Sequence, residues 1–582
     1  MSTSTTDRVS ELRGSLAELF EDVLESYEYV DMPVERYVFF VLVPAAGVFV
    51  GTLALGLFVN LPGVARYPIP MLGLLVLVTA VVYPRLLRSQ EKIAMENQYH
   101  LVMTHITVLA TTNIDRMEVF REIASVEEYD AFAAELGRVV RLVDTWNQSL
   151  DDACRRRAKE VPSAPVADLF ERLAYTLGAG QELSDFLLGE QSVMLTNYET
   201  MYQSALDNLE VMKDLYLSMI LSMTFALVFA VVLPILTGTD PTVTVGAVIA
   251  LFVFIQVGFY LVIRTMVPFD PVWYHTDDVD PPVEGYARAS IVVGGFLTFA
   301  LIGVTASGLF GGPVSLDGLL GAGSLPQPLY VCIPLTPLVV PGVIFTVLER
   351  RIIERDDEFP SFIRALGASE SAKQSTTSAV LSSLREKDFG SLTENVDELF
   401  KRLNMRIDPT RAWEFFAIDT QSYLIQKFSE MYLVGRQMGG DPKQLGELIS
   451  KNMNTVVQLR ERREQSTVTL IGLLYGITAA ASFAFFIGLS IVSVLSGMSF
   501  DLSGTGTFAA DQIIHTKSYD IPTIRFLLVI VVLFNAGLSS LMIREVDGGH
   551  KISAYLHFVL LAWIGCGTAV LTQTVVTGLL ST

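Results

Sequence analysis

The sequence predicts an all-α, polytopic membrane protein with about nine transmembrane helices and two duplicated cytoplasmic helical bundles. The 582 residues are 51% hydrophobic and 18% charged, with a mean hydropathy of +0.45. This composition is too apolar for an ordinary soluble protein. Apolar runs of about 20 residues, the length that spans a bilayer as a helix, recur along the chain. The polar segments between them show helical periodicity and almost no strand-like alternation.

The apolar runs also predict how the chain is oriented. They lie near residues 38–60, 68–87, 215–237, 243–264, 290–310, 328–348, 468–496, 522–543 and 553–580. With a cytoplasmic N-terminus, only Arg66, Lys517 and the border residue Arg525, among 41 Lys and Arg, lie outside or at an outer edge. This distribution satisfies the positive-inside rule. We therefore expect a multi-pass protein of the cell membrane with its C-terminus outside the cell.

The order of apolar and polar segments predicts a parallel repeat. Two spans, a polar domain and two further spans occur twice in the same orientation, and a ninth span follows. The predicted boundaries are an acidic amphipathic segment at 1–37, spans at 38–88, a first cytoplasmic domain at 89–214, spans at 215–265, a Pro- and Asp-rich linker at 266–289, spans at 290–348, a second cytoplasmic domain at 349–467 and spans at 468–582.

A glycine-containing turn recurs in the two cytoplasmic domains. The tract "ERLAYTLGAGQELSDFL" (171–187) contains Gly178 and Gly180, and "SEMYLVGRQMGGDPKQLGELI" (429–449) contains Gly439 and Gly440. Glycine at such a corner allows one helix to end and the next to fold back. We interpret these four residues as structural turns, and the spacing of the flanking residues predicts that the second turn is two residues longer.

The segment before the third span predicts a long helix with an apolar seam. Its apolar residues have an alternating three-four spacing, which is typical of a heptad; they are Leu195, Tyr198, Tyr202, Ala205, Leu209, Met212 and Tyr216. Nothing in the sequence interrupts a helix between this seam and the span. The seam either packs within the chain's own bundle or forms a subunit contact.

The charge balance limits the classes of partner. The net charge is −21, and the basic residues are 30 Arg and 11 Lys. A surface rich in carboxylates and Arg is typical of proteins adapted to very high salt, although an acidic cytosolic surface is the simpler alternative. The same charge argues against a nucleic-acid partner, because phosphate binding requires a basic face.

No motif predicts an enzyme, a cofactor or a metal site. A Gly-Lys-Ser/Thr phosphate loop is absent from the sequence. His100 and His105 lie five residues apart, whereas four would place both on one helix face, and the three cysteines are most simply unpaired thiols. The predicted spans have no charged residue in their middles, which disfavours a proton- or ion-coupled transporter.

Two basic clusters are exceptions on this acidic chain. They comprise Arg155, Arg156, Arg157 and Lys159 in the first domain, and Arg460, Arg462 and Arg463 next to the seventh span. A basic cluster can direct the docking of an acidic partner. The alternatives are ion pairs of the first cluster with Asp151, Asp152 and Glu160, or a solvated face, and for the second cluster the positive charge expected next to a span.

Together these features resemble a known family. A helical domain that ends in "RLAYTLGAGQELSDFL" and continues as a long helix into a pair of spans is similar to the F domain of type II secretion and type IV pilus platform proteins. The tracts "HLVMTHITVLATTNIDRMEVFREIA" (100–124) and "LVDTWNQSLDDACRRRAKEVPS" (142–163), with nine spans, look most like the archaellum platform (FlaJ/ArlJ) family of archaea.

The resemblance implies a mechanical role without catalysis. Such platforms lie under a filament, act as homodimers, and couple a cytoplasmic hexameric ATPase to filament subunits, which are archaellins or pilins. The seven basic residues are then candidates for ATPase docking. The alternatives are the platform of an adhesive pilus or a secretion system, or, in a different class, a multispanning transporter.

Overall fold

The computed structural model consists of helices in the part of the chain that it describes. The described residues are 37–58, 95–112, 114–268, 270–274, 282–309, 315–321, 325–373, 377–497 and 519–580. An isolated antiparallel bridge joins Trp273 to Ser422. Apart from the turn at residues 111–112, the described chain up to Gln191 forms one compact unit, and the chain from Ser192 forms a second.

Seven helical segments of the described chain are long and apolar enough to cross a membrane. They are α10–α11 (Leu183–Val232 and Pro234–Thr237), α12 (Pro241–Met266), α13 (Pro282–Leu309), α15–η4–α16 (Leu329–Leu335, Thr336–Leu338 and Val339–Lys373), α21 (Pro442–Gly497), α22 (Ile521–Asp547) and α23 (Ala554–Leu580). They contain the third to ninth predicted spans. The first predicted span contains η2 (Val38–Leu42) and the shorter apolar helix α3 (Val43–Phe58), and the second (68–87) lies outside the described residues. The count of nine therefore stays a prediction.

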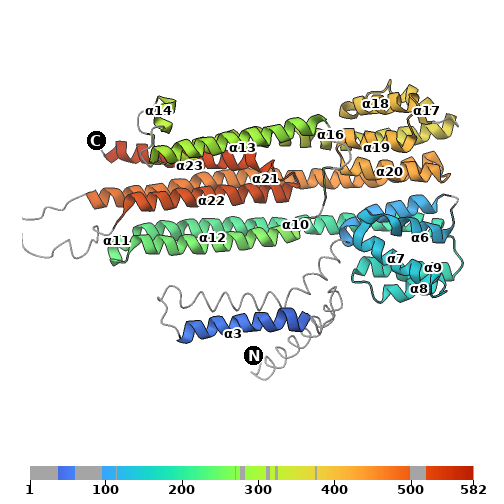
Figure 1. Cartoon of the computed structure of the whole chain (residues 1–582), viewed down its shortest axis with the longest axis horizontal. Helices are drawn as coiled ribbons and strands as arrows, with labels where there is room; N and C mark the ends of the chain where they lie inside the picture. Colours follow the sequence, from blue (N-terminus) through green and yellow to red (C-terminus); the bar gives the residue numbers. More distant parts are fainter. Residues whose placement is uncertain are drawn as a thin grey trace, which may run out of the picture. The chain divides into compact units, whose positions relative to one another are not determined.

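The first unit contains a bundle that we call module 1 (residues 95–182). A helix at 95–110 is followed by α6 (Arg116–Ser125), η3 (Glu127–Tyr129), α7 (Asp130–Asp144), α8 (Leu150–Ala158) and α9 (Ala164–Gly178) (Figure 1). Local sequence sets these boundaries. The side chains of Asp115 and Ser149 accept hydrogen bonds from the free N–H groups at the starts of α6 and α8.

The second unit contains an equivalent bundle, module 2 (residues 354–441). It consists of the C-terminal half of α16, then α17 (Thr377–Leu384), η5 (Gly390–Leu392), α18 (Thr393–Asn404), α19 (Pro409–Thr420) and α20 (Tyr423–Gln437). Helices α19, α20 and α21 each begin 259 residues after α8, α9 and α10. The constant offset supports the predicted duplication, although few residues are shared.

The two modules also share a polar contact between their first and last helices. In module 1, the hydroxyl of Ser163, just before α9, donates to Glu96 at 3.4 Å. In module 2, the equivalent Ser422 donates to Asp356 and also accepts the N–H of Ile425 at the start of α20. Ser422 thus caps α20 while it ties that helix to α16, whereas the side chain of Ser163 ties α9 to the first helix of module 1 without capping it.

The recurrent turn has the same length in both modules, so the prediction of two additional residues was wrong. Gly180 and Gly439 are the left-handed residues, with φ of +80° and +85°. The next N–H, of Gln181 or Gly440, bonds to the carbonyl five residues earlier, at 3.2 and 2.8 Å. These are the bonds of a Schellman motif. Gly178 instead lies in the last turn of α9, so the sequence comparison placed the glycine pairs out of register.

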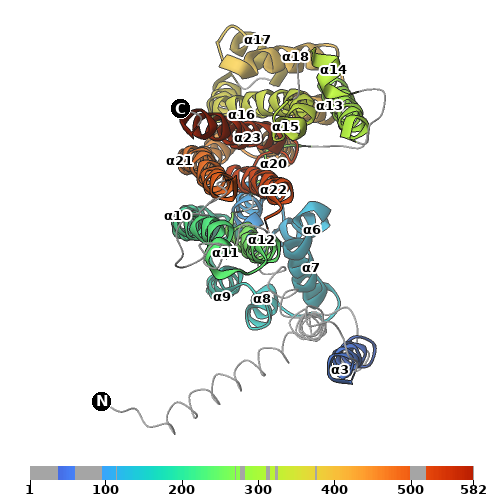
Figure 2. The same cartoon turned by 90° about the vertical axis from the view of Figure 1, so that its left-hand side faces the viewer.

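The apolar helices of the second unit pack in successive layers. α10 and α12 pack next to α21 and α22, and α23, α16 and α13 follow (Figure 2). Leu227, Phe252, Phe485 and Val532 belong to one buried cluster. Within it, Gln256 of α12 donates to Asn535 of α22 at 2.7 Å. This hydrogen bond between two polar side chains of the apolar spans links a span of the first repeat to one of the second.

Two of the cysteines, far apart in sequence, meet between α15 and α23. The thiol of Cys332 donates to the carbonyl of Ala562 on α23 at 3.2 Å, and Cys566 lies about one helical turn beyond Ala562 on the same helix. We expect a membrane-permeant oxidant to join these two thiols as a disulfide. The number of cysteines that can be alkylated after denaturation should fall from three to one, and Cys566→Ala should abolish the oxidation. If all three thiols stay alkylatable after oxidation, the packing of α15 on α23 is wrong.

Candidate functional site

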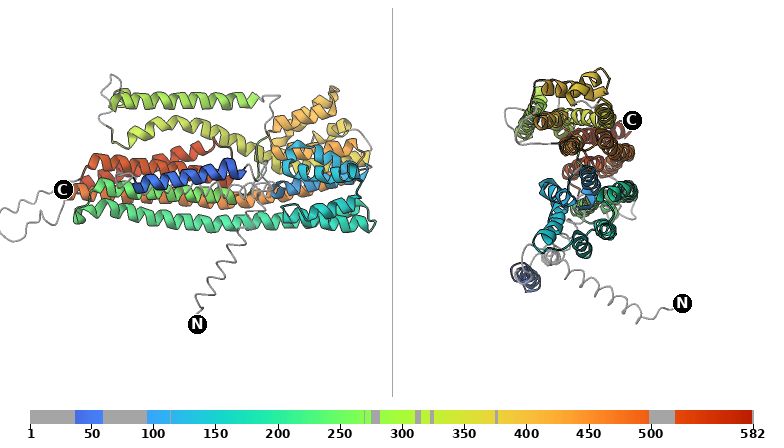
Figure 3. Two further views of the ribbon diagram at one scale, coloured as in Figure 1. Left: turned by 60° about the horizontal axis from the view of Figure 1, so that its bottom comes forward. Right: turned by 90° about the vertical axis from the view of Figure 1, so that its right-hand side faces the viewer.

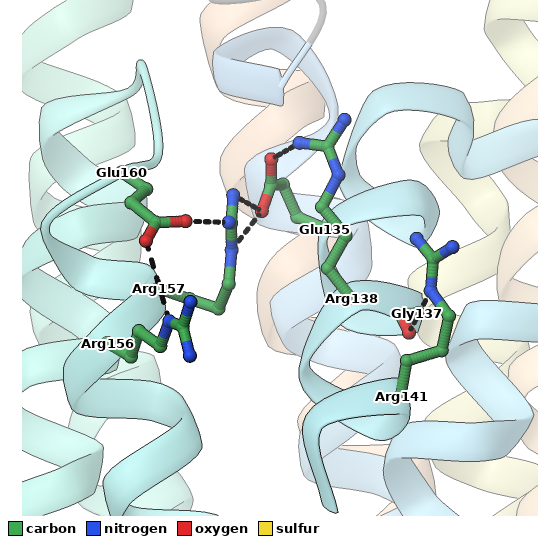
Figure 4. A network of polar contacts seen from close by, with 7 residues as sticks. All are labelled: Glu135, Gly137, Arg138, Arg141, Arg156, Arg157 and Glu160. Carbon is green, nitrogen blue, oxygen red and sulfur yellow. Dashed lines mark hydrogen bonds and ion pairs between the residues drawn. The ribbon is translucent and has the colours of Figure 1, made fainter. Parts of the chain in front are cut away.

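The first basic cluster lies on α8, where Arg157 is part of an internal ion-pair network. Its guanidinium donates to the fully buried carboxylate of Glu135 on α7 at 2.8 and 3.0 Å, and also pairs with Glu160 (Figure 4). Arg138 pairs with the other oxygen of Glu135. A buried carboxylate requires such partners. Arg157 therefore holds α8 against α7, and only 11% of its side chain is exposed.

The other three cations of this cluster form an exposed face of α8. Arg155 and Arg156 are each 56% exposed, and Lys159 is exposed as well. Arg155 pairs with Asp152 at 3.4 Å, and Arg156 with Glu160 at 3.6 Å. Exposed pairs of this kind are worth only about 0–1 kcal/mol. A partner can therefore displace them at little cost, so we restrict the candidate docking face of α8 to Arg155, Arg156 and Lys159.

Module 2 lacks this basic face. At the positions on α19 equivalent to Arg155, Arg156 and Lys159 it has Glu414, Phe415 and Ile418. Where module 1 has Arg157, module 2 has Phe416, whose ring lies 5.5 Å from that of Trp413 and 6.0 Å from that of Phe362. An aromatic core thus replaces the ion-pair network. The two modules share a fold but not the chemistry of this face.

In the second basic cluster, Arg460 of α21 is the centre of a buried triad. Its guanidinium donates to both oxygens of Asp270, at 2.6 and 2.5 Å, and to Asp356 of α16 at 2.6 Å. All three side chains are at most 10% exposed. Burial outweighs the attraction of Arg460 and raises the pKa of Asp356 to about 6. At neutral pH this carboxylate is therefore charged, and Arg460 stabilises its buried charge.

The neighbouring arginines have different partners. Arg463 is 3% exposed and donates to the carbonyls of Val546 (2.6 Å) and Glu545 (3.0 Å) at the end of α22. It satisfies acceptors that a helix C-terminus leaves free. Arg462 is 46% exposed and pairs with Glu199 of α10 at 3.3 Å. Two of these three arginines thus form buried internal contacts, which leaves only Arg462 accessible to a partner.

The linker between the repeats is bound to module 2 where it is described. The N–H of Tyr274 donates to Gln421 at 2.9 Å, and the N–H of Tyr423 donates to Val272 at 3.1 Å. The indole N–H of Trp273 donates to Glu349 of α16 at 3.1 Å. Together with Asp270, these bonds attach the chain that leaves α12 to α16, α20 and α21. The sequence predicted an irregular connector and missed this attachment, because no local pattern marks Asp270 as the partner of an arginine 190 residues away.

A cavity of about 370 Å³ adjoins the triad. Seven of its fifteen lining residues are acidic, among them Glu354 and Asp357 of α16, Glu461 and Glu464 of α21, and Asp547 at the end of α22. Among the described residues, no cluster of His, Cys, Asp or Glu has a geometry that could hold a metal ion. Beside this cavity, the bond from Arg460 to Asp356 joins α21 to α16, and Arg463 joins α21 to the end of α22.

The apolar seam of α10 is buried within the second unit. Leu195, Tyr198, Tyr202, Leu209 and Tyr216 are each at most 6% exposed. Ala205 and Met212 are half-buried, and the burial of the other five members supports the interpretation that the seam packs within the chain. Helix α10 itself continues without a break from Leu183 to Val232, as the sequence predicted (Figure 3).

Comparison with known proteins identifies relatives over almost the whole chain. The family profile of protein F of the type II secretion system matches residues 102–232, which run from module 1 to the end of α10. The flagella accessory protein J of Methanocaldococcus jannaschii is 30% identical over 551 residues, which cover 94% of this chain and 96% of the relative. The protein of the same name from Methanococcus voltae is 32% identical over 552 residues, which cover 94% and 97%. No solved structure matches the chain.

These relatives cover both modules and the apolar helices between and after them. The resemblance stated from the sequence is thereby confirmed, whereas neither relative bears on the predicted adaptation to high salt, which stays a prediction. The chain is a multi-pass membrane protein with a type II secretion F domain, and it belongs to the family of the flagella accessory protein J.

Proposed function

We propose that this protein is the membrane platform of the archaellum, and that it couples a cytoplasmic hexameric motor ATPase to the assembly and rotation of the filament. Both modules face the cytoplasm in this proposal, as the distribution of Lys and Arg requires. Archaellins are the filament subunits that it handles, and the protein acts as a homodimer. The names of its relatives and the secretion F domain support this role.

The continuity of α10 and α21 supports the proposal most directly. Helix α10 has 50 residues and α21 has 56, so at 1.5 Å per residue they are about 75 and 84 Å long. Each helix begins at the corner that ends a module and continues into an apolar stretch. A displacement of the first turns by a partner is thus delivered to the membrane without an intervening loop.

The exposed cations of α8 are the proposed charge contact with the ATPase. Arg155, Arg156 and Lys159 are accessible, and Arg462 is the accessible member of the second cluster. Arg157, Arg460 and Arg463 act indirectly, because they hold the helices that carry the docking face. This division separates a docking defect from a folding defect in mutant experiments.

We expect the double variant Arg155→Glu/Arg156→Glu to retain about fivefold less ATPase on purification from membranes at low salt, since it places like charges against an acidic partner. The loss should shrink at high salt, where exposed charges are screened. The matched control is Lys387→Glu/Lys443→Glu, which changes the net charge equally at two other exposed sites. If the two double variants, present at equal levels in the membrane, retain equal amounts of ATPase, the α8 face is not part of the docking surface.

A further inference from the structure

Large apolar side chains are rarely exposed on the two modules. Among the described residues of module 1, Trp146 (71% exposed) and Tyr175 (79%) are the exposed large hydrophobic side chains, and in module 2 Met405 (67%) is the only one. Single exposed apolar residues are ordinary on a protein surface. Two of these residues are nevertheless informative, because they occupy equivalent positions in the two modules.

Trp146 and Met405 occupy the same position in the two modules. Each directly precedes a non-glycine residue in the left-handed conformation, Asn147 (φ 51°) or Arg406 (φ 59°), and these two residues are 259 apart, the offset that relates α8 to α19. In both corners the N–H after the left-handed residue bonds back into the preceding helix at 3.2 Å. The N–H of Gln148 bonds to the carbonyl of Leu142, six residues earlier, and that of Ile407 to the carbonyl of Arg402, five residues earlier.

The corner itself does not require an apolar residue at this place. A Schellman-type helix end gains its apolar contact from the residue after the left-handed position and one in the preceding turn. A side chain that is two-thirds exposed buries little apolar area, so it contributes little to folding. A polar residue would build the same corner. Both modules nevertheless present a large apolar side chain there, and Tyr175 has no such counterpart because the equivalent Val434 is half-buried.

We infer that Trp146 and Met405 are equivalent contact residues, through which the two modules dock onto two subunits of one cytoplasmic oligomer. This inference rests on the proposed function, since the oligomer is the motor ATPase. A symmetric oligomer presents the same binding site on each of its subunits, and this chain carries an equivalent contact residue in each of its two modules. Tryptophan and methionine are enriched at the centres of protein interfaces, where they fill pockets of the partner.

The charges near the two residues define the pocket that they fit. Arg155 and Arg156, on the exposed face of α8, come after Trp146 in the chain, and Arg406 and Arg411 come after Met405. Arg406 and Arg411 are exposed and have no ion pair within the described chain. The complementary site is a shallow apolar pocket bordered by carboxylates. Because module 2 lacks the basic face of α8, the apolar corner is the contact that both modules can make.

The first test places a photo-reactive benzoylphenylalanine at position 146 or 405 of the full-length protein, in cells that contain the ATPase. We expect both positions to crosslink to the ATPase on irradiation. The same probe at Tyr175 is the control, because that residue is equally exposed but not repeated, and it should give at least fivefold less of this product. Crosslinks from 146 and 405 to lipid, to filament subunits or to a second copy of this chain would overturn the inference.

The second test uses Trp146→Ser/Met405→Ser, with Tyr175→Ser as the matched control. We expect the double variant to retain about tenfold less ATPase, at low and at high salt, because salt does not screen apolar contacts. Membrane levels and protease resistance should equal those of the wild type, since these side chains are exposed. If the double variant retains ATPase like the wild type while Arg155→Glu/Arg156→Glu loses it, the inference fails and the proposed function stands. If the wild-type protein itself retains no ATPase at either salt concentration, the proposed function fails as well.

Discussion

Replacing Glu210, Val211 and Asp214 by glycine is expected to abolish motility, whereas replacing the same three residues by alanine is expected to preserve it. All three are exposed on α10, just before its apolar half. Both triple variants lose the pair of Glu210 with Lys213, whose side chain is 12% exposed, so they differ only in helix propensity. Glycine costs about 1 kcal/mol per residue relative to alanine in a helix interior. Three such changes therefore destabilise this part of α10 by about 3 kcal/mol.

The measurement is swimming of cells that carry each variant, together with electron microscopy of their filaments, at equal membrane levels of the protein. Loss of motility in the glycine variant alone shows that the stiffness of α10 is required. Full motility of the glycine variant would rule out rigid transmission through this helix. If both variants lose motility equally, the exposed side chains themselves are required, and stiffness is not the explanation.

Arg460→Met is expected to have the largest effect on stability, with a loss of about 3–5 kcal/mol. The change leaves the buried carboxylates of Asp270 and Asp356 without their counter-charge. Both would have to take up protons or admit water for the protein to stay folded. The measurement is thermal denaturation of the purified protein, with protease resistance at the junction of α16 and α21 as a second readout.

The neighbouring Arg462→Met is the matched control, because Arg462 is half exposed and pairs at the surface with Glu199. This change should cost less than about 1 kcal/mol. The triple variant Asp270→Asn/Asp356→Asn/Arg460→Met should recover part of the loss, since it removes all three buried charges together. Equal destabilisation by Arg460→Met and Arg462→Met would contradict the structural role assigned to the triad.

The predictions from sequence that the structure supports rest on short-range patterns. The long apolar runs, the heptad of α10 and the glycines at the corners each determine local structure through residues a few positions apart. The error in the recurrent turn has the same origin. Gly178–Gly180 and Gly439–Gly440 are similar as letters, but the left-handed conformation at Gly180 and Gly439 defines the true register.

Sequence alone could not divide the seven basic candidates into accessible and internal residues. Arg155, Arg156 and Arg157 are consecutive, yet a helix turns by about 100° per residue, so two lie on the exposed face and the third reaches Glu135. Arg460 and Arg462 differ in the same way. Arg157 also has a local partner in Glu160, but its buried partner Glu135 is 22 residues away, and Asp270 is 190 residues from Arg460. No local pattern indicates these distant pairings.

The amino-acid sequence by itself determined that this protein is helical, membrane-spanning and duplicated, because hydropathy, helical periodicity and corner residues depend only on neighbouring positions. The tertiary structure alone decided which charges are free to meet a partner, that the linker is attached at Asp270, and that Trp146 and Met405 occupy equivalent corners. The physical reason is that burial and ion pairing depend on which helices pack together. That packing brings together groups as distant in the chain as Asp270, Asp356 and Arg460.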